Sequence, residues 1–197
     1  MPTDIHPEEG LSGVELILTK LHAGGKFDND AYQYSAGLHG VGVSVVNFLT
    51  ETLEVEVKRD GAIHYMKFER GIAAEPLKKI GRSKKTGTLI RFKPDPDIFE
   101  TLEFNYDTLA ARFRELAFLN AGITISFTDE RKGKEDTWKY AGGIVEFLKH
   151  LNAARKVVHP RPIHFHKTRE FERRDRQSEE TQKETMEIEV AIQYNEN

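Results

Sequence analysis

Three features are missing from this sequence of 197 residues: cysteine, a long apolar run and a start that resembles a secretory signal. Without cysteine, disulfides and thiolate metal sites are excluded. Because no stretch of about eighteen apolar residues occurs, no transmembrane helix is predicted. The opening, Met-Pro-Thr-Asp-Ile-His, lacks the basic-then-apolar order of a signal peptide, so we expect a cytoplasmic protein. The net charge of −3 gives the chain as a whole no attraction to nucleic acid.

The composition is that of an ordinary globular protein, with 38% hydrophobic and 31% charged residues. The chain is long enough for one sizeable core, or for one domain and part of another. Apolar residues at helical spacing predict helices at 14–21, 41–49, 109–117 and 144–151. Ser12 and Glu15 form a capping-box pattern that opens the first of them. Alternating apolar residues predict strands at 53–57, 64–68, 88–92, 123–127, 138–140, 163–166 and 186–194.

These elements are interleaved without βαβ regularity, which predicts the α+β class, with one mixed sheet that carries helices on one face. Asp60-Gly61 predicts a tight hairpin turn between the first two strands. The tract 168–184 is almost entirely polar or charged and has no periodicity. Because it has so little apolar surface to bury, we predict a solvated or disordered loop there.

Glycine is concentrated in the first quarter of the chain. Five glycines lie between positions 24 and 42: Gly24, Gly25, Gly37, Gly40 and Gly42. Glycine tolerates positive φ and allows a backbone to approach a ligand closely. A glycine-rich loop that leads into a helix N-terminus presents free amides, which suit phosphate. Glycine spacing alone leaves a second interpretation open, a flexible loop followed by a core helix.

The amino-acid sequence around these glycines is a more specific signal than their spacing. Leu-His-Ala-Gly-Gly-Lys-Phe at 21–27 and Gly-Leu-His-Gly-Val-Gly at 37–42 resemble the ATP lid of bacterial type II topoisomerase B subunits. That family comprises the DNA gyrase B subunit and its topoisomerase IV counterpart, and it has the GHKL-type ATP-binding fold also found in histidine kinases. The resemblance extends from Pro2 to about Tyr194, and the segments 113–120 and 142–151 are more similar to gyrase B than to topoisomerase IV.

The resemblance implies an ATP-binding domain at 1–158, incomplete at its N-terminus, and the truncated start of a ribosomal S5-like transducer domain at 159–197. It also implies roles for single residues. Backbone amides of the lid would hold the β- and γ-phosphates of ATP; the matching residues are Gly24, Gly25, Lys26, Tyr32, Gly37, Leu38, His39, Gly40, Val41 and Gly42. Thr88 would reach the adenine side, Pro2 would form a pocket wall, and Arg59 would contact aminocoumarin inhibitors at the mouth. By residue type alone, Lys26 and Arg59 are surface cations and Thr88 is a strand threonine.

The family's general base and its magnesium-binding asparagine have no counterpart in this sequence. We therefore assign no catalytic residue, expect a segment of a longer protein, and expect the segment alone to be inactive. The parent would be an ATP-hydrolysing type II topoisomerase that uses ATP with Mg²⁺ to drive DNA strand passage and negative supercoiling. Its partners would be DNA, the gyrase A subunit and a second B subunit, with no membrane association. The alternatives are a topoisomerase IV B subunit and a non-catalytic, nucleotide-responsive interaction module.

Three histidines lie close together near the end of the chain, at positions 159, 164 and 166. Their spacing suggests a zinc site, but no cysteine is present to complete one. We therefore predict that His159, His164 and His166 are solvent-facing residues and assign no metal ligand.

Overall fold

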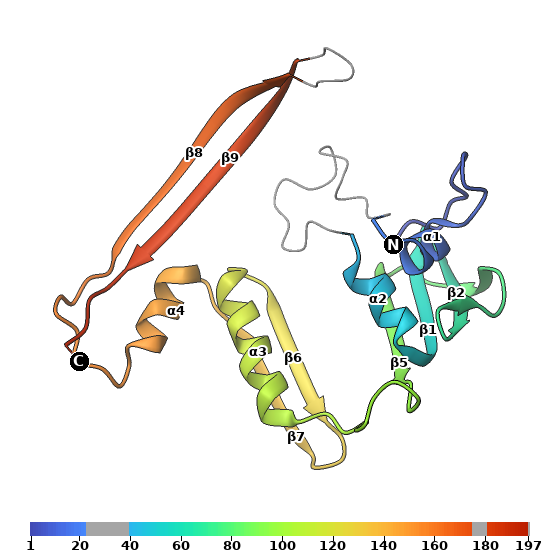
Figure 1. Cartoon of the computed structure of the whole chain (residues 1–197), viewed down its shortest axis with the longest axis horizontal. Helices are drawn as coiled ribbons and strands as arrows, with labels where there is room; N and C mark the ends of the chain where they lie inside the picture. The colour runs from blue at the N-terminus through green and yellow to red at the C-terminus, as the bar shows by residue number, and fades with distance from the viewer. Residues whose placement is uncertain (23–39, 175–180, 197) are drawn as a thin grey trace. The chain divides into compact units, whose positions relative to one another are not determined.

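The computed structural model describes residues 1–22, 40–174 and 181–196. Two compact units, Met1–Glu103 and Phe104–Asn197, divide the chain (Figure 1). The two units are distinguished by the contacts that their residues make, which does not test the domain boundary predicted after residue 158.

The first unit begins with helix α1, Gly13–Thr19. The Ser12 hydroxyl accepts a hydrogen bond from the Glu15 amide at 3.2 Å, which confirms the predicted N-terminal cap. Val14 and Leu18 are fully buried on one face of the helix. The helix ends at Thr19, earlier than predicted, and Leu21 is exposed.

An antiparallel sheet follows, made of β1 (Thr50–Arg59), β2 (Ala62–Glu69), β3 (Ile72–Ala73), β4 (Lys78–Arg82) and β5 (Gly87–Pro94). The strand order is β3-β2-β1-β5, and β4 also pairs with β2. The sequence predicted β1, β2 and β5 but not the short strands β3 and β4. At the β1–β2 turn Asp60 and Gly61 have φ values of 50° and 76°, so the predicted hairpin turn is confirmed.

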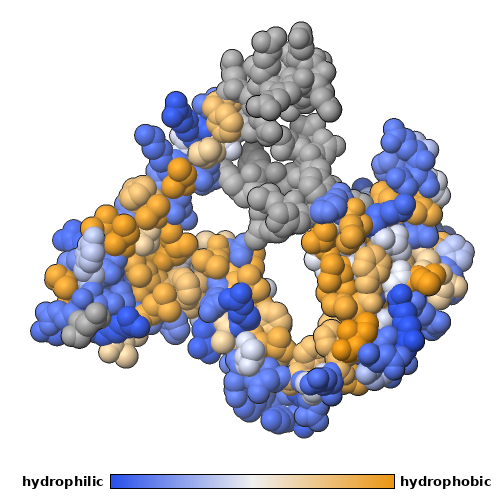
Figure 2. All heavy atoms as spheres, viewed as in Figure 1, coloured by the Kyte–Doolittle hydropathy of each residue, from blue (hydrophilic) through white to orange (hydrophobic). Residues whose placement is uncertain are grey.

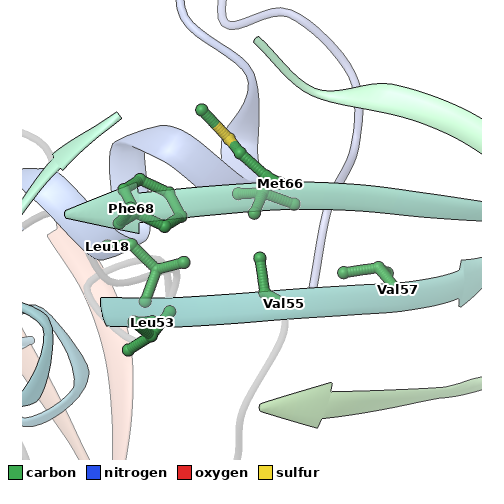
Figure 3. Packing of buried hydrophobic residues seen from close by; sticks show 7 residues of the cluster. Leu18, Leu53, Val55, Val57, Met66 and Phe68 are labelled. Carbon is green, nitrogen blue, oxygen red and sulfur yellow. The ribbon is translucent and has the colours of Figure 1, made fainter. Parts of the chain in front are cut away.

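The core of this unit lies between α1 and one face of the sheet. Figure 3 labels six of its side chains, those of Leu18 in α1 and of Leu53, Val55, Val57, Met66 and Phe68 in β1 and β2. Val14 of α1 also belongs to this core. Along β1 the core residues alternate with half-buried polar ones, as the period of two predicted.

Helix α2, Gly42–Phe48, has its polar side turned inward. Ser44 and Asn47 are fully buried, whereas Val45 and Phe48 are 38% and 37% exposed. Figure 2 shows apolar residues gathered on the surface where α2 and β5 lie. The apolar spacing therefore predicted the helix correctly, but of its apolar residues only Val43, which is partly buried, packs against the core described above.

The second unit contains α3 (Tyr106–Leu119), the hairpin of β6 (Thr124–Asp129) and β7 (Lys134–Lys139), and α4 (Gly143–Leu151). All four elements were predicted. Asn105 caps α3 by accepting a hydrogen bond from the Thr108 amide at 2.9 Å. Tyr106, Ala110, Ala117 and Trp138 form a small core between α3 and the hairpin.

A long ribbon of β8 (Ile163–Arg174) and β9 (Thr181–Ile192) completes this unit. It corrects the prediction of a loop at 168–184, because Thr168 pairs with Glu187 and the pairing continues to Arg174 and Thr181. Antiparallel backbone hydrogen bonds can order a polar segment without apolar burial along its whole length. The base of the ribbon is joined to α4, since Asn152 donates to the Gln193 side chain at 2.9 Å.

The predicted α+β class is confirmed. The described strands form three antiparallel sheets, β1–β5, β6–β7 and β8–β9, where the sequence predicted one mixed sheet. Among the described residues, no helix has the length and apolar composition needed to span a membrane.

Candidate nucleotide-binding site

The first unit contains a pocket of about 360 Å³ at the end of β1. Strand register creates it, because Val57 pairs with Thr88 and Lys58 with Gly87 where β1 and β5 lie side by side. The end of β1 with the turn after it, and the start of β5 with the residue before it, supply nearly all of its lining, which is Met1, Val57, Lys58, Arg59, Asp60, Thr86, Gly87 and Thr88. The lining combines an apolar floor with a hydroxyl and a guanidinium group.

Arg59 and Thr88, two of the residues singled out from the sequence, thus line the same pocket. The Thr88 hydroxyl accepts a hydrogen bond from the Met1 amino group at 3.4 Å. Arg59 is exposed, and its Nε donates to the neighbouring Asp60 carboxylate at 3.1 Å. A hydroxyl can donate and accept, and a guanidinium presents a fork of donors, so both groups can orient a polar ligand above Val57.

Pro2 lies beside this pocket and is not part of its lining. It packs on Gly13, where an added Cβ would lie 2.7 Å from the Pro2 ring and 2.8 Å from its carbonyl oxygen. Glycine at position 13 therefore allows the start of the chain to lie against α1. This contact holds the residue adjacent to Met1, which does line the pocket.

Gly40, Val41 and Gly42 lie where α2 begins, and they are not among the residues that line this pocket. Gly40 has a φ of 59°, a left-handed conformation that favours glycine. At Gly42 an added Cβ would meet no atom of the described residues within 4 Å. The other lid residues, namely Gly24, Gly25, Lys26, Tyr32, Gly37, Leu38 and His39, lie outside the described residues.

Asn47 is a residue of interest that the sequence analysis missed. Its fully buried side chain donates to the carbonyl oxygen of Leu18 at 3.0 Å and to that of Gly71 at 3.3 Å. It therefore links α1 and the β2–β3 turn to α2, the helix that starts at Gly42. Its Oδ1 atom has no hydrogen-bond partner among the described residues. The sequence does contain a signal that could have identified Asn47. Ser44 and Asn47 lie three residues apart in an otherwise apolar helix, which places two polar groups on one face.

The three histidines near the end of the chain contact other protein groups. His164 on β8 pairs with Glu189 of β9 at 2.9 Å, and His166 pairs with Glu187. The His159 ring lies 2.7 Å from the Arg161 carbonyl oxygen. In the part of the chain that the structure describes, no three His, Cys, Asp or Glu side chains are grouped so that they could hold a metal ion.

Comparison with known proteins gives a consistent result, although no family model matches the chain. The chain is 50% identical to the DNA gyrase B subunit of Halalkalibacterium halodurans over 197 residues, which is 99% of this chain and 29% of the relative. It is 52% identical to the type 2 topoisomerase B subunit of Aquifex aeolicus over 80% of this chain and 20% of the relative.

The solved structures include a crystal structure of the 43K ATPase domain of Thermus thermophilus gyrase B in complex with an aminocoumarin. It matches with a TM-score of 0.70 and 38% identity, over 85% of this chain and 42% of that one. The chain thus spans less than a third of the length of the gyrase B relative. Residues 1–197 therefore match part of the DNA gyrase B subunit in sequence, and most of the chain matches part of the ATPase domain of the T. thermophilus relative in structure.

Proposed function

We propose that this chain is the nucleotide-binding part of a DNA gyrase B subunit, and that the pocket between β1 and β5 receives the adenine end of ATP. The observation that carries the proposal is that Arg59 and Thr88, selected by motif from positions 29 residues apart, line one pocket. The T. thermophilus relative is described as an ATPase domain, which supports the same assignment.

In this site each of three side chains would contact a different part of the ligand. Val57 offers an apolar surface to the base, and the Thr88 hydroxyl can donate to or accept from its polar edge. Arg59 at the rim can contact polar groups that extend out of the pocket. The amides of the segment 37–42, together with Lys26, would bind the phosphates of ATP and its Mg²⁺ complex. We assign no general base, so hydrolysis requires groups other than those identified in this sequence.

At the level of the whole protein, we propose that nucleotide binding drives a conformational step that brings two B subunits together and couples ATP hydrolysis to DNA strand passage and negative supercoiling. DNA and the gyrase A subunit would be the other partners, and the protein would act in the cytoplasm. Gyrase is preferred to topoisomerase IV because relatives that match nearly the whole chain are gyrase B subunits.

Binding of a fluorescent, non-hydrolysable ATP analogue to Thr88→Ala tests the pocket assignment. Loss of one hydrogen bond worth about 0.5–1.5 kcal/mol should weaken binding by up to about tenfold. Thr124→Ala is the matched control, since Thr124 is an exposed strand threonine in the second unit. Equal affinity of the Thr88→Ala variant and the wild type would show that the base lies elsewhere.

A further inference from the structure

A second charged feature lies next to the pocket, on β4 and the turn that follows it. Residues 78–85 contain five cations and no acidic residue: Lys78, Lys79, Arg82, Lys84 and Lys85. Lys78 pairs with Glu75 at 2.5 Å. Lys79, Arg82, Lys84 and Lys85 are exposed, and within the described ranges none of these four has a carboxylate within ion-pair distance. We call these four residues the basic edge.

Several cations on other strands of the same sheet are paired. Arg91 on β5 contacts Glu56 at 3.1 Å, and Lys67 on β2 contacts Glu69 at 2.7 Å. The basic edge differs because like charges lie beside one another and, among the described residues, no carboxylate is within ion-pair distance of them. Such repulsion is relieved when an anion binds, so the basic edge favours an anionic partner.

The basic edge is held on rigid backbone, and part of it faces the same way as the pocket. Arg82 pairs across the sheet with Ala62, which in turn pairs with Arg59, so these residues share one face. The Ser83 amide donates to the Gly61 carbonyl at 3.1 Å, which joins the β4–β5 turn to the β1–β2 turn.

The turn itself is also fixed. The Ser83 hydroxyl accepts from the Lys85 amide at 3.0 Å, which orders the backbone that carries Lys84 and Lys85. The cations are therefore presented as a spaced row on a folded surface. A row of fixed cations fits a ligand with a repeating negative charge better than it fits a single anion.

We propose that the basic edge binds the phosphate backbone of double-stranded DNA. A net charge of −3 provides no attraction from the chain as a whole, so contact with DNA requires a local surface of this kind. In the proposed function, a single nucleotide would bind to the pocket and the segment 37–42 instead. The choice of DNA as the polyanion rests on the proposed function, whereas the anion-binding surface rests on the charges alone.

Fluorescence anisotropy with a short labelled DNA duplex, measured over a series of salt concentrations, tests this. For the whole 197-residue chain, log K should fall with log salt, and the double variant Lys84→Glu/Lys85→Glu should bind at least about tenfold more weakly. Its salt slope should be smaller by about two, because each lost phosphate contact removes about 0.9. The matched control is Lys139→Glu/Lys149→Glu, which makes the same change in net charge at exposed positions of the second unit.

Circular dichroism checks that each variant is folded, and Lys84→Gln/Lys85→Gln repeats the test without charge reversal if the first variant is not. Equal weakening by both charge reversals, or no duplex binding by the wild type, would overturn the proposal. Competition by polyglutamate as strong as by duplex at equal charge would also overturn it, in favour of an acidic protein partner. ATP-analogue binding is measured in parallel and should be unaffected by Lys84→Glu/Lys85→Glu. A chain that fails to bind nucleotide but binds duplex through the basic edge would refute the proposed function and leave this inference standing.

Discussion

Asn47→Ala should loosen the first unit by removing the link between α1, α2 and the β2–β3 turn. The Asn47 amide donates to two carbonyl oxygens, those of Leu18 and Gly71, which come from parts of the chain distant in sequence. Its side chain is fully buried, so water cannot readily replace the lost donors.

The expected magnitude follows from these contacts. A buried acceptor left without a donor costs about 1–3 kcal/mol, and two acceptors are affected. Removal of the unpaired Oδ1 atom offsets about one such penalty. The net loss should be about 1–3 kcal/mol, which corresponds to an opening equilibrium about 5- to 150-fold larger.

Amide hydrogen exchange of β1 measures this opening directly, because β1 lies in the middle of the sheet of the first unit. Ser44→Ala is the matched control: Ser44 is equally buried on α2, but among the described residues its hydroxyl bonds only to Val41, whose carbonyl also accepts from the Val45 amide. It should cost about 1 kcal/mol or less. Fluorescence of Trp138, in the second unit, should not change in either variant. If Asn47→Ala accelerates exchange no more than Ser44→Ala does, Asn47 does not link these elements.

Two further predictions concern a turn and a buried phenol. Gly71→Ala should lower the stability of the first unit by more than Gly61→Ala does in thermal unfolding; both residues have positive φ, but only at Gly71 would the new Cβ overlap a side chain, that of Phe48. Equal losses of stability in the two variants would show that the Phe48 side chain can move away from the new Cβ at little cost. Burial, assisted by a hydrogen bond to Asp136, raises the pKa of Tyr106 from 10.0 to about 12. Because the folded pKa exceeds the unfolded one, this contribution to stability is complete below pH 10 and is lost as pH rises toward 12. Tyr106→Phe should flatten that part of the stability profile, and an unchanged profile would contradict the assignment.

Local patterns in the sequence predicted the elements that are stabilised by residues close to one another in the sequence. The period of two at Leu53, Val55 and Val57 predicted β1, because a buried face requires apolar residues at alternate positions. Asp60-Gly61 predicted its turn, because these residue types tolerate the positive φ that the turn requires. The capping pattern of Ser12 likewise gave the start of α1.

Long-range effects decided the features that were missed. The inward face of α2 depends on hydrogen bonds from Asn47 to carbonyls 29 and 24 residues away, which helical spacing cannot reveal. The strands predicted at 163–166 and 186–194 extend to 163–174 and 181–192, and this extension depends on cross-strand backbone bonds, so the polar composition of the tract was misleading. The motif identified Arg59 and Thr88, but only strand register showed that they line one pocket.

Gly42→Val tests the central claim, that the start of α2 and the adjoining glycine segment bind the phosphates of ATP. Gly42 suits this test because its φ lies outside the left-handed region and an added Cβ would meet no atom of the described residues within 4 Å. Gly40 does not suit it, since its φ of 59° would strain any other side chain.

Calorimetric titration of the wild type and the variant with a non-hydrolysable ATP analogue and Mg²⁺ is the direct measurement. We predict an unchanged melting temperature and an affinity at least about tenfold lower for Gly42→Val, because the added side chain would occupy space that the phosphates need. Equal affinity of the two proteins, with both folded, would contradict the assignment of this segment to phosphate.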